Sequence, residues 1–326
     1  MKKQNMIVGI DIGGTNTAFG FLDHRNKFLY EDSFLTESND GAEKFVQKLA
    51  KSIKEAYSNY SEQYELSGIS IAAPSADYFS GYIESSANLQ WKRVNLVEMM
   101  KKYFDIPIII LNDGNAAAIG EHTQGSAAGM KNFLVLTLGT GVGSGIMING
   151  ELLYGHDGHA GELGHMIIKP NGRKCKCGKF GCLETYVSAN GIRRTAISLL
   201  GYYDAPSKLR NISYNDLTSL KISELAKQGD PIALKAFDYT GRILGRALSN
   251  IVTYFSPEAI ILFGGLAESA ELLLKPTNYY FEKYLLDIYK GKVKILKSEL
   301  QNGKAAIFGA CSFLLREINK KEVSYD

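Results

Sequence analysis

Asp11-Ile12-Gly13-Gly14-Thr15 follows an apolar run near the start of the chain, and this stretch decides how the rest is interpreted. A second glycine-rich stretch, Leu138-Gly139-Thr140-Gly141-Val142-Gly143, follows another apolar run, and Phe263-Gly264-Gly265 follows a third. Each places glycines at the end of an expected buried strand, where the missing Cβ lets backbone N–H groups approach an anion. Two loops of the phosphate-binding type and a late Gly-Gly pair indicate one nucleotide held in a cleft between two similar halves.

The segments that flank these glycines are expected to be strands. Residues 6–11 and 17–22 enclose the first glycine pair, and residues 133–138 and 145–148 enclose the second glycine-rich stretch. A strand directly after the glycines excludes the Rossmann arrangement, which needs a helix there. The repeated order of strand, glycine turn and strand indicates a duplicated α/β core. Helices are expected over residues 41–60, from Pro231 to about Phe255, and over residues 304–318.

The overall composition is that of an ordinary globular protein. Of 326 residues, 45% are hydrophobic and 22% are charged, and the net charge of +3 gives no argument for a nucleic-acid or acidic-membrane partner. No apolar run approaches the roughly 20 residues that span a bilayer. The apolar run at residues 6–10 is too short for the core of a signal peptide. We therefore expect a cytoplasmic protein with neither a nucleic-acid nor a membrane partner.

Asp113 is the candidate general base. An apolar strand over residues 107–111 delivers Asn112 and Asp113 at its carboxyl end, and residues 114–118 begin a helix. Phosphorylation of a hydroxyl needs a carboxylate to accept the proton of the alcohol as the phosphoryl group arrives. Asp113 in this position can also serve as the helix N-cap, and the two roles are compatible.

Cysteines are concentrated in one irregular segment that is also rich in glycine and histidine, residues 150–191. Three thiolates and one imidazole satisfy tetrahedral zinc, and four protein ligands indicate a closed, structural site. A coincidental cysteine-rich loop is the alternative, and His159 is the competing imidazole ligand. Cys311 stands apart and is expected to be a buried apolar side chain. The expected zinc ligands are His165, Cys175, Cys177 and Cys182.

Two carboxylates and one amide are candidates for binding a polyol. Glu162 and Glu184 flank the expected zinc loop, which can orient them toward sugar hydroxyls, since carboxylates accept hydrogen bonds strongly. Isolated glutamates are more often solvated surface residues. Asn88 adds an amide that both donates and accepts, and the nearby Trp91 is expected to serve packing rather than sugar stacking.

Together these residues resemble the ROK family of bacterial sugar kinases, which have the actin-like, hexokinase-type ATPase fold: two α/β lobes around a cleft. The resemblance covers nearly the whole chain, and its most specific segment is Cys-x-Cys-Gly-x-x-Gly-Cys-x-Glu, from Cys175 to Glu184. It implies that ATP and Mg²⁺ phosphorylate the 6-hydroxyl of a hexose, with Asp113 as base. It also implies structural Zn²⁺ and a homo-oligomer, a dimer or a tetramer. The chain departs from the family at Pro74-Ser75, where Pro-Gly is common, and at Gly114, where alanine is usual.

The resemblance assigns further residues to two groups. The sugar-binding group is Asn88, Asn112, Asp113, Glu162, His165 and Glu184. The nucleotide-binding group is Asp11, Gly13, Gly14, Thr15, Asn16, Thr137, Gly139, Thr140, Gly141, Gly264 and Gly265. By analogy with two-lobed kinases, residues 1–112 plus 305–326 form the smaller lobe, and residues 113–304 form the larger lobe with the zinc loop.

Several functions are compatible with these motifs. A glucokinase is expected first, and a kinase for N-acetylglucosamine or N-acetylmannosamine is the alternative, because the same motifs serve those sugars. A sugar-responsive repressor of the same family carries an extra DNA-binding domain; here about five residues precede the first strand, and no helix-turn-helix pattern is present. A non-catalytic sugar-binding protein is disfavoured by Asp113 and by both phosphate-type loops.

Overall fold

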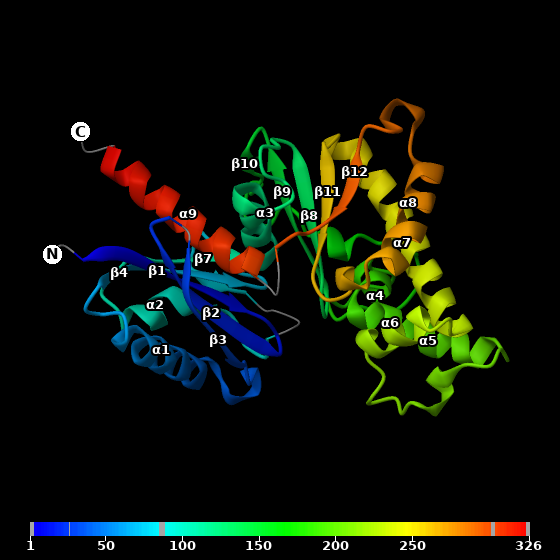
Figure 1. The fold of residues 1–326 in the computed structure, drawn as a ribbon, viewed down its shortest axis with the longest axis horizontal. Helices are drawn as coiled ribbons and strands as arrows, with labels where there is room; N and C mark the ends of the chain where they lie inside the picture. Colours follow the sequence, from blue (N-terminus) through cyan, green and yellow to red (C-terminus); the bar gives the residue numbers. More distant parts are fainter. Residues whose placement is uncertain (1–2, 26, 85–88, 301–303, 324–326) are drawn as a thin grey trace. The chain divides into compact units, whose positions relative to one another are not determined.

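The computed structural model describes residues 3–25, 27–84, 89–300 and 304–323, with side chains as far as residue 318. These residues form two compact units (Figure 1). The first unit comprises Met1–Gly129, Leu152–Ala160 and Glu299–Asp326, and the second comprises Met130–Glu151 and Gly161–Ser298.

The first unit is built on a five-stranded mixed sheet. The first three strands of the chain pair antiparallel, and the two later strands, on the other side of the first strand, pair parallel. The order across the sheet is β3 (Phe28–Leu35), β2 (Asn16–Asp23), β1 (Gln4–Ile12), β4 (Tyr64–Ala73) and β7 (Ile108–Asn112).

Both faces of β1 are buried, because helices cover the first sheet on opposite sides (Figure 1). Val8 and Ile10 face α1 (Ala42–Ser58), whereas Ile7 packs against α9 (Lys304–Val323). Successive side chains of a strand point to opposite faces, so the continuous apolar run of β1 serves two cores. The remaining elements of this unit are η1 (Ser38–Asp40), β5 (Tyr82–Ile83), β6 (Val94–Asn95), α2 (Leu96–Lys101) and α3 (Asp113–Gln124).

The second unit repeats the sheet of the first. Its order is β10 (Glu151–Leu152), β9 (Val142–Ile148), β8 (Phe133–Leu138), β11 (Ala259–Phe263) and β12 (Lys294–Lys297). As in the first sheet, the hairpin pair is antiparallel and the later strands are parallel. The duplicated core expected from the two glycine-rich stretches is therefore present.

The helices of the second unit lie between β10 and β12 in the chain. The longest, α7, begins at Pro231 after its N-cap Asp230 and ends at Phe255, as the sequence predicts. The other elements are η2 (Leu163–His165), α4 (Glu184–Val187), α5 (Ala189–Tyr202), η3 (Lys208–Asn211), α6 (Ser219–Lys227), η4 (Ala267–Ser269), α8 (Glu271–Tyr284) and η5 (Asp287–Tyr289).

Helix α3 belongs to the first unit, so the first division of the chain lies after Gly129 rather than after Asn112. The reason is a close helix crossing between α3 and α9. A Cβ at Gly309 of α9 would lie 1.7 Å from the carbonyl oxygen of Ala116, and a Cβ at Gly120 would lie 2.1 Å from that of Ala305. The structure also assigns residues 152–160 to the first unit, a return of the chain that the sequence did not predict.

Replacing Gly309 with alanine is expected to lower the free energy of unfolding by about 2 kcal/mol or more, because the backbones of α3 and α9 must move apart. Gly201→Ala in α5 is the matched control, since nothing lies within 4 Å of a Cβ built there. Urea unfolding monitored by circular dichroism measures both. Equal stabilities of the two variants would contradict the close crossing.

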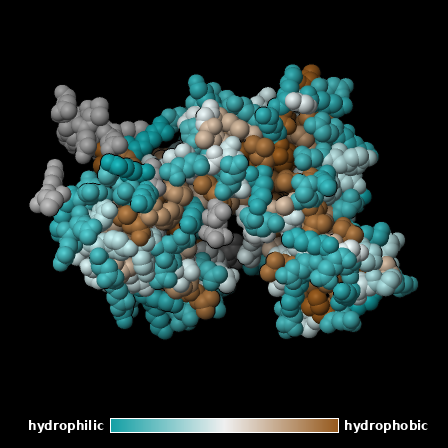
Figure 2. Space-filling view, viewed as in Figure 1, coloured by the Kyte–Doolittle hydropathy of each residue, from teal (hydrophilic) through white to brown (hydrophobic). Residues whose placement is uncertain are grey.

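Hydrophilic residues dominate the face shown in Figure 2, with limited hydrophobic patches over each unit. Among the helices in the described part of the chain, none combines the length and the apolar character that crossing a bilayer requires.

Candidate functional site

One group of candidate site residues lies at the carboxyl edge of the first sheet. Asp11 pairs with Ala72 near the end of β1, and Ala73 pairs with Asn112 at the end of β7. Strands β1, β4 and β7 are parallel, so Asp11, Asn112 and Asp113 all lie at one edge. Ligands of α/β proteins bind at this edge of the sheet.

Asn112, not Asp113, is the N-cap of α3. Its Oδ1 accepts hydrogen bonds from the N–H groups of Gly114 (2.9 Å) and Asn115 (3.3 Å). Asp113 is the first residue of the helix, is half-buried, and accepts a 2.8 Å hydrogen bond from the N–H of Gly114. The positive end of the helix dipole favours the ionised carboxylate there. The cap therefore leaves Asp113 for other chemistry, and it leaves the Nδ2 amide group of Asn112 for a ligand.

Asp11 and Asp113 interact electrostatically. Burial, and after it the negative charge of Asp113, raises the pKa of Asp11 from 3.8 to about 7. Two carboxylates at one sheet edge repel each other and favour a bound cation or a proton on one of them. Perturbed carboxyl groups of this kind are typical of functional sites.

The Asp11→Asn variant is expected to be more stable than the parent without ligands, and its advantage should grow with pH. The folded carboxyl (pKa about 7) holds a proton that the unfolded one (pKa 3.8) releases, so stability falls as pH rises between these values. Between pH 5 and pH 8 the advantage should grow by about 3 kcal/mol, since the interval covers nearly two pH units below the folded pKa at about 1.36 kcal/mol each. Thermal unfolding at both pH values measures this stability advantage, with the exposed Asp105→Asn variant as control. An advantage that does not change with pH would contradict the raised pKa of Asp11.

The first glycine turn is a hairpin turn between β1 and β2, and a residue outside these two strands holds it in place. The N–H of Gly13 donates to the carbonyl of Asn16 (2.9 Å), and the hydroxyl of Thr36 donates to the carbonyl of Gly13 (2.7 Å). Gly14, Thr15 and Asn16 are exposed. The first glycine pair thus lies in a β-hairpin turn, and the exposed tip of this turn remains compatible with binding phosphate. Thr36, which fixes the turn, gave no signal in the sequence.

The second glycine turn and the Gly264-Gly265 pair meet at the edge of the second sheet. Phe263 pairs with Thr137 on the parallel strands β11 and β8, so the residues that follow both strands are neighbours. A Cβ at Gly264 would lie 3.0 Å from the backbone of Leu138, and the φ of Gly264 is +97°. Glycine is required there, because few other residues adopt that conformation and none fits the space.

Internal hydrogen bonds define the shape of this second turn. The hydroxyl of Thr137 accepts from the N–H of Gly143 (3.0 Å), and the carbonyls of Gly139 and Thr140 accept from the start of α5. The Asn190 side chain donates one of these bonds, at 3.1 Å. With its carbonyls bound to α5, the turn can present N–H groups to an anion.

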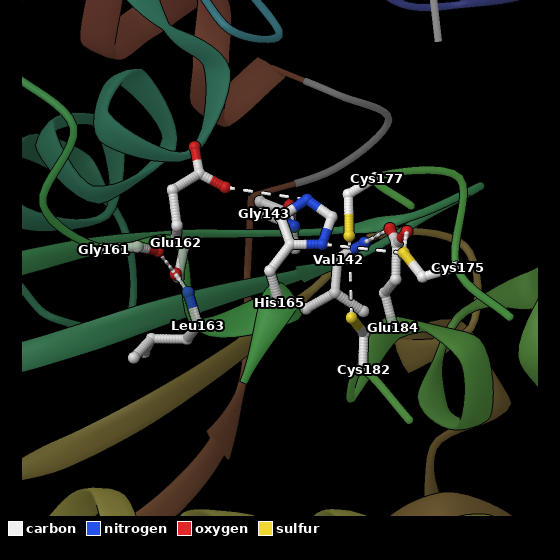
Figure 3. A network of polar contacts seen from close by, with 12 residues as sticks. Val142, Gly143, Gly161, Glu162, Leu163, His165, Cys175, Cys177, Cys182 and Glu184 are labelled. Atoms are coloured by element: carbon white, nitrogen blue, oxygen red, sulfur yellow. Dashed lines mark hydrogen bonds and ion pairs between the residues drawn. The ribbon is translucent and has the colours of Figure 1, made fainter. Parts of the chain in front are cut away.

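Figure 3 shows the cysteines and the histidine of the second unit gathered at one point. The candidate ligand atoms of His165, Cys175, Cys177 and Cys182 all lie within 4.8 Å of one another. The sulfurs of Cys177 and Cys182 are 3.7 Å apart, and the sulfur of Cys175 is 3.7 Å from Nδ1 of His165. The competing ligand His159 belongs to the first unit and is exposed.

These distances fit a tetrahedral metal. With Zn–S bonds of about 2.3 Å, the sulfurs of a tetrahedral zinc site lie about 3.8 Å apart, whereas a disulfide needs about 2.05 Å. The donor set of three thiols and one imidazole is the set that zinc prefers. His165 directs Nδ1 into the cluster, which leaves Nε2 on the other edge of the ring.

Both expected sugar-binding glutamates lie beside this cluster (Figure 3). Glu162 is 3.9 Å from Nε2 of His165. Glu184 accepts a 3.0 Å hydrogen bond from Cys175 through Oε1 and a weak 3.4 Å one from the N–H of Val142 through Oε2. Glu184 thus connects the cysteine–histidine cluster to the second glycine turn.

Arg173 anchors the candidate metal loop, which is the segment from Arg173 to Cys182 that carries the three cysteines. The sequence alone did not indicate this role of Arg173. Its guanidinium donates to the carbonyls of Thr185 (2.8 Å) and Gly191 (2.9 Å) and lies 4.6 Å from the centre of the Tyr186 ring. Burial lowers the pKa of Arg173. A single arginine in a basic loop resembles a solvated residue, so only the structure identifies this anchor.

Two other predictions are confirmed, and one lies outside the described residues. Trp91 is buried against Phe45, with a ring-centroid distance of 4.9 Å, so it serves packing. Cys311 is fully buried in the α9 core. Asn88 falls in the segment 85–88, which the structure does not describe.

Comparisons with known proteins agree with this arrangement. The family model described as "ROK family" matches residues 7–317. A glucokinase of Halalkalibacterium halodurans is 35% identical over 283 residues, 86% of each chain, and a glucokinase of Thermotoga maritima is 31% identical over 96% of this chain and 98% of its own. The structure of a Streptomyces griseus ROK glucokinase in complex with glucose and AMPPNP superposes with a TM-score of 0.80 at 31% identity, over 94% of this chain and 98% of the other. The chain therefore belongs to the ROK family and has the two-lobe α/β fold of its sugar kinases, the actin-like ATPase fold.

Proposed function

We propose that this chain is an ATP-dependent glucokinase, which transfers the terminal phosphoryl group of ATP to the 6-hydroxyl of glucose. The observation that carries the proposal is the half-buried carboxylate of Asp113 at the carboxyl edge of the first sheet, beside Asp11. Relatives named as glucokinases, at 31–35% identity over most of the chain, support glucose as the substrate.

Asp113 acts as the general base. Its carboxylate accepts the proton of the 6-hydroxyl while that oxygen forms a bond to the terminal phosphorus and the bond from phosphorus to the bridging oxygen of ATP breaks. The transferred group then leaves as a sugar phosphate, and ADP remains. The helix dipole of α3 keeps the carboxylate ionised until it takes the proton, and phosphoryl transfer requires little further covalent help from the protein.

The glycine turns are assigned to the nucleotide. Gly13 shapes the first turn, and the exposed tip at Gly14, Thr15 and Asn16 would offer N–H and hydroxyl groups to phosphate oxygens, as would the second turn at residues 139–141. Gly264 and Gly265 would leave room for the adenosine. Asp11 would hold Mg²⁺, which when bound neutralises charge on the phosphates. The mutual repulsion of Asp11 and Asp113 is relieved by such a cation.

The metal cluster orders the sugar-binding residues. Zn²⁺ held by Nδ1 of His165 and the sulfurs of Cys175, Cys177 and Cys182 would close the loop. Glu162, Glu184 and Nε2 of His165 would then contact sugar hydroxyls from fixed positions. Asn112, through its amide group, and Asn88 complete the expected sugar contacts.

A screen of ATP-dependent phosphorylation tests this proposal. Purified protein is assayed with glucose, mannose, N-acetylglucosamine and N-acetylmannosamine, and ³¹P NMR locates the phosphate on each product. We expect kcat/KM for glucose to exceed that for either N-acetyl sugar at least tenfold, with the phosphate on the 6-oxygen. A preference for an N-acetyl sugar would establish the alternative kinase, and sugar binding without any phosphorylation would establish a binding protein.

A further inference from the structure

A cavity of about 410 Å³ lies in the second unit beside α7 and α8, and none of the residues that line it is among those assigned above to sugar, nucleotide or metal. Three cationic side chains line it: Lys169, Arg242 and Arg246. The cavity is also lined by two tyrosine side chains, Tyr239 and Tyr284. The volume falls within the range of about 300–1,000 Å³ that is usual for small-molecule sites.

The three cations have no carboxylate partner. Within the described part of the chain, none of them forms an ion pair with an acidic side chain. The carboxylate one turn before Arg242, that of Asp238, hydrogen-bonds Tyr280 instead. Three like charges around one concavity repel each other, so an anion that binds between them is stabilised by all three.

The shape of the donors favours a phosphate with a ring attached. Guanidinium groups bind phosphate oxygens in a bidentate manner, and two arginines are present. Arg242 lies over the ring of Tyr239, 5.1 Å from its centre, so its guanidinium is held at the cavity wall. The ring of Tyr284 is 45% exposed and stacks on Tyr280 with a centroid distance of 6.5 Å, and its exposed part offers stacking area to a sugar or a base.

The wall of this cavity is continuous with the metal loop. Arg246 donates a 2.9 Å hydrogen bond to the carbonyl of Ile168. The N–H groups of Ile168 and Lys169 donate to the carbonyl of Gly181 at 3.0 and 3.3 Å, and Gly181 directly precedes the metal ligand Cys182. An anion that joins Lys169 to Arg246 therefore restrains the segment of residues 167–169, which pairs with the chain at Gly181 and Cys182.

We propose that this cavity is an effector site for a small organic phosphate, and that its occupation favours the ordered form of the metal loop. Binding itself is independent of the proposed function. Only the expected consequence, a two- to fivefold fall in the KM for glucose, depends on it.

Calorimetric titration of the zinc-loaded protein tests the site, with glucose 6-phosphate, ADP and inorganic phosphate as separate probes. Glucose 6-phosphate and ADP represent the two sources of an organic phosphate, a sugar and a nucleotide. We expect one of them to bind the parent at two sites per chain, since each is also a product of the proposed reaction. The Lys169→Gln/Arg242→Gln variant should retain one site and lose the other or bind there at least tenfold more weakly.

The matched control is Lys227→Gln/Lys235→Gln, which removes the same charge from exposed positions on α6 and α7. It should retain both sites. The inference is overturned if the double variant titrates like the parent, or if inorganic phosphate binds the cavity as tightly as either organic probe. If no sugar is phosphorylated, the proposed function fails, yet the second binding site still decides this inference.

Discussion

The Asp113→Asn variant is expected to keep its fold and its affinity for glucose while kcat falls by about three orders of magnitude. Asparagine has the same size and leaves the Asn112 cap of α3 in place, so the sheet edge should not change. It cannot accept the proton of the 6-hydroxyl, and general base catalysis contributes typically about 10²–10⁴-fold. Turnover by coupled detection of ADP, and glucose binding by calorimetry, measure the two effects separately.

Asp105→Asn is the control for this experiment, because Asp105 is exposed and lies just before β7 in the same unit. It should turn over like the parent. Turnover of the Asp113→Asn variant within threefold of the parent would remove Asp113 from the mechanism. A loss of glucose binding without a loss of turnover at saturation would make Asp113 a sugar ligand only.

Loss of one metal ligand is expected to raise the KM for glucose at least tenfold and to expose the metal loop to proteases. The Cys177→Ser variant removes the exposed ligand of the four, so the core should tolerate it. Without the metal, the loop keeps the Arg173 anchor but loses the link between His165 and the cysteines. Zinc content by mass spectrometry, limited proteolysis and the KM for glucose give three independent readings.

Cys311→Ala is the matched control, since Cys311 lies in the α9 core of the first unit, apart from the metal cluster. It should bind one zinc ion per chain, with the KM of the parent. Parent protein without zinc, or a Cys177→Ser variant with unchanged KM and protease resistance, would contradict a structural metal in this loop.

Short sequence patterns correctly predicted the elements whose own residues mark where they begin or end. The glycine turns, the strands around them and the Asp230-Pro231 start of α7 correspond to the structure within a few residues. These features depend on interactions between residues that are close in the sequence, because a glycine turn or a helix cap is recognisable without knowing its tertiary neighbours.

Elements whose sequences conflict with a local rule were not predicted. Helix α8 contains Pro276, which removes a helical hydrogen bond and normally ends a helix. The structure places the proline ring where α7 has Gly241, so that a Cβ at Gly241 would lie 2.7 Å from it. Tight packing between α7 and α8 thus accommodates the proline, and that packing is a tertiary property that no local window contains.

The residues of the candidate site also fall into a group that the sequence indicated and a group that it did not. The candidate catalytic and sugar-binding side chains were visible in the sequence, as were the four candidate metal ligands, because cysteine spacing is informative on its own. The residues that support it were not visible: Thr36 and Arg173 act through hydrogen bonds to residues distant in the chain. The capping role of Asn112, which leaves Asp113 at the first position of the helix, also required atomic positions.

A crystal structure with glucose and AMPPNP bound shows whether Asp113 is the general base, through the distance from the Asp113 carboxylate to the 6-oxygen of the sugar. We expect about 2.6–3.2 Å, with that oxygen facing the terminal phosphorus. A distance above about 5 Å, with another carboxylate such as Glu162 or Glu184 in contact with the 6-oxygen, would contradict it.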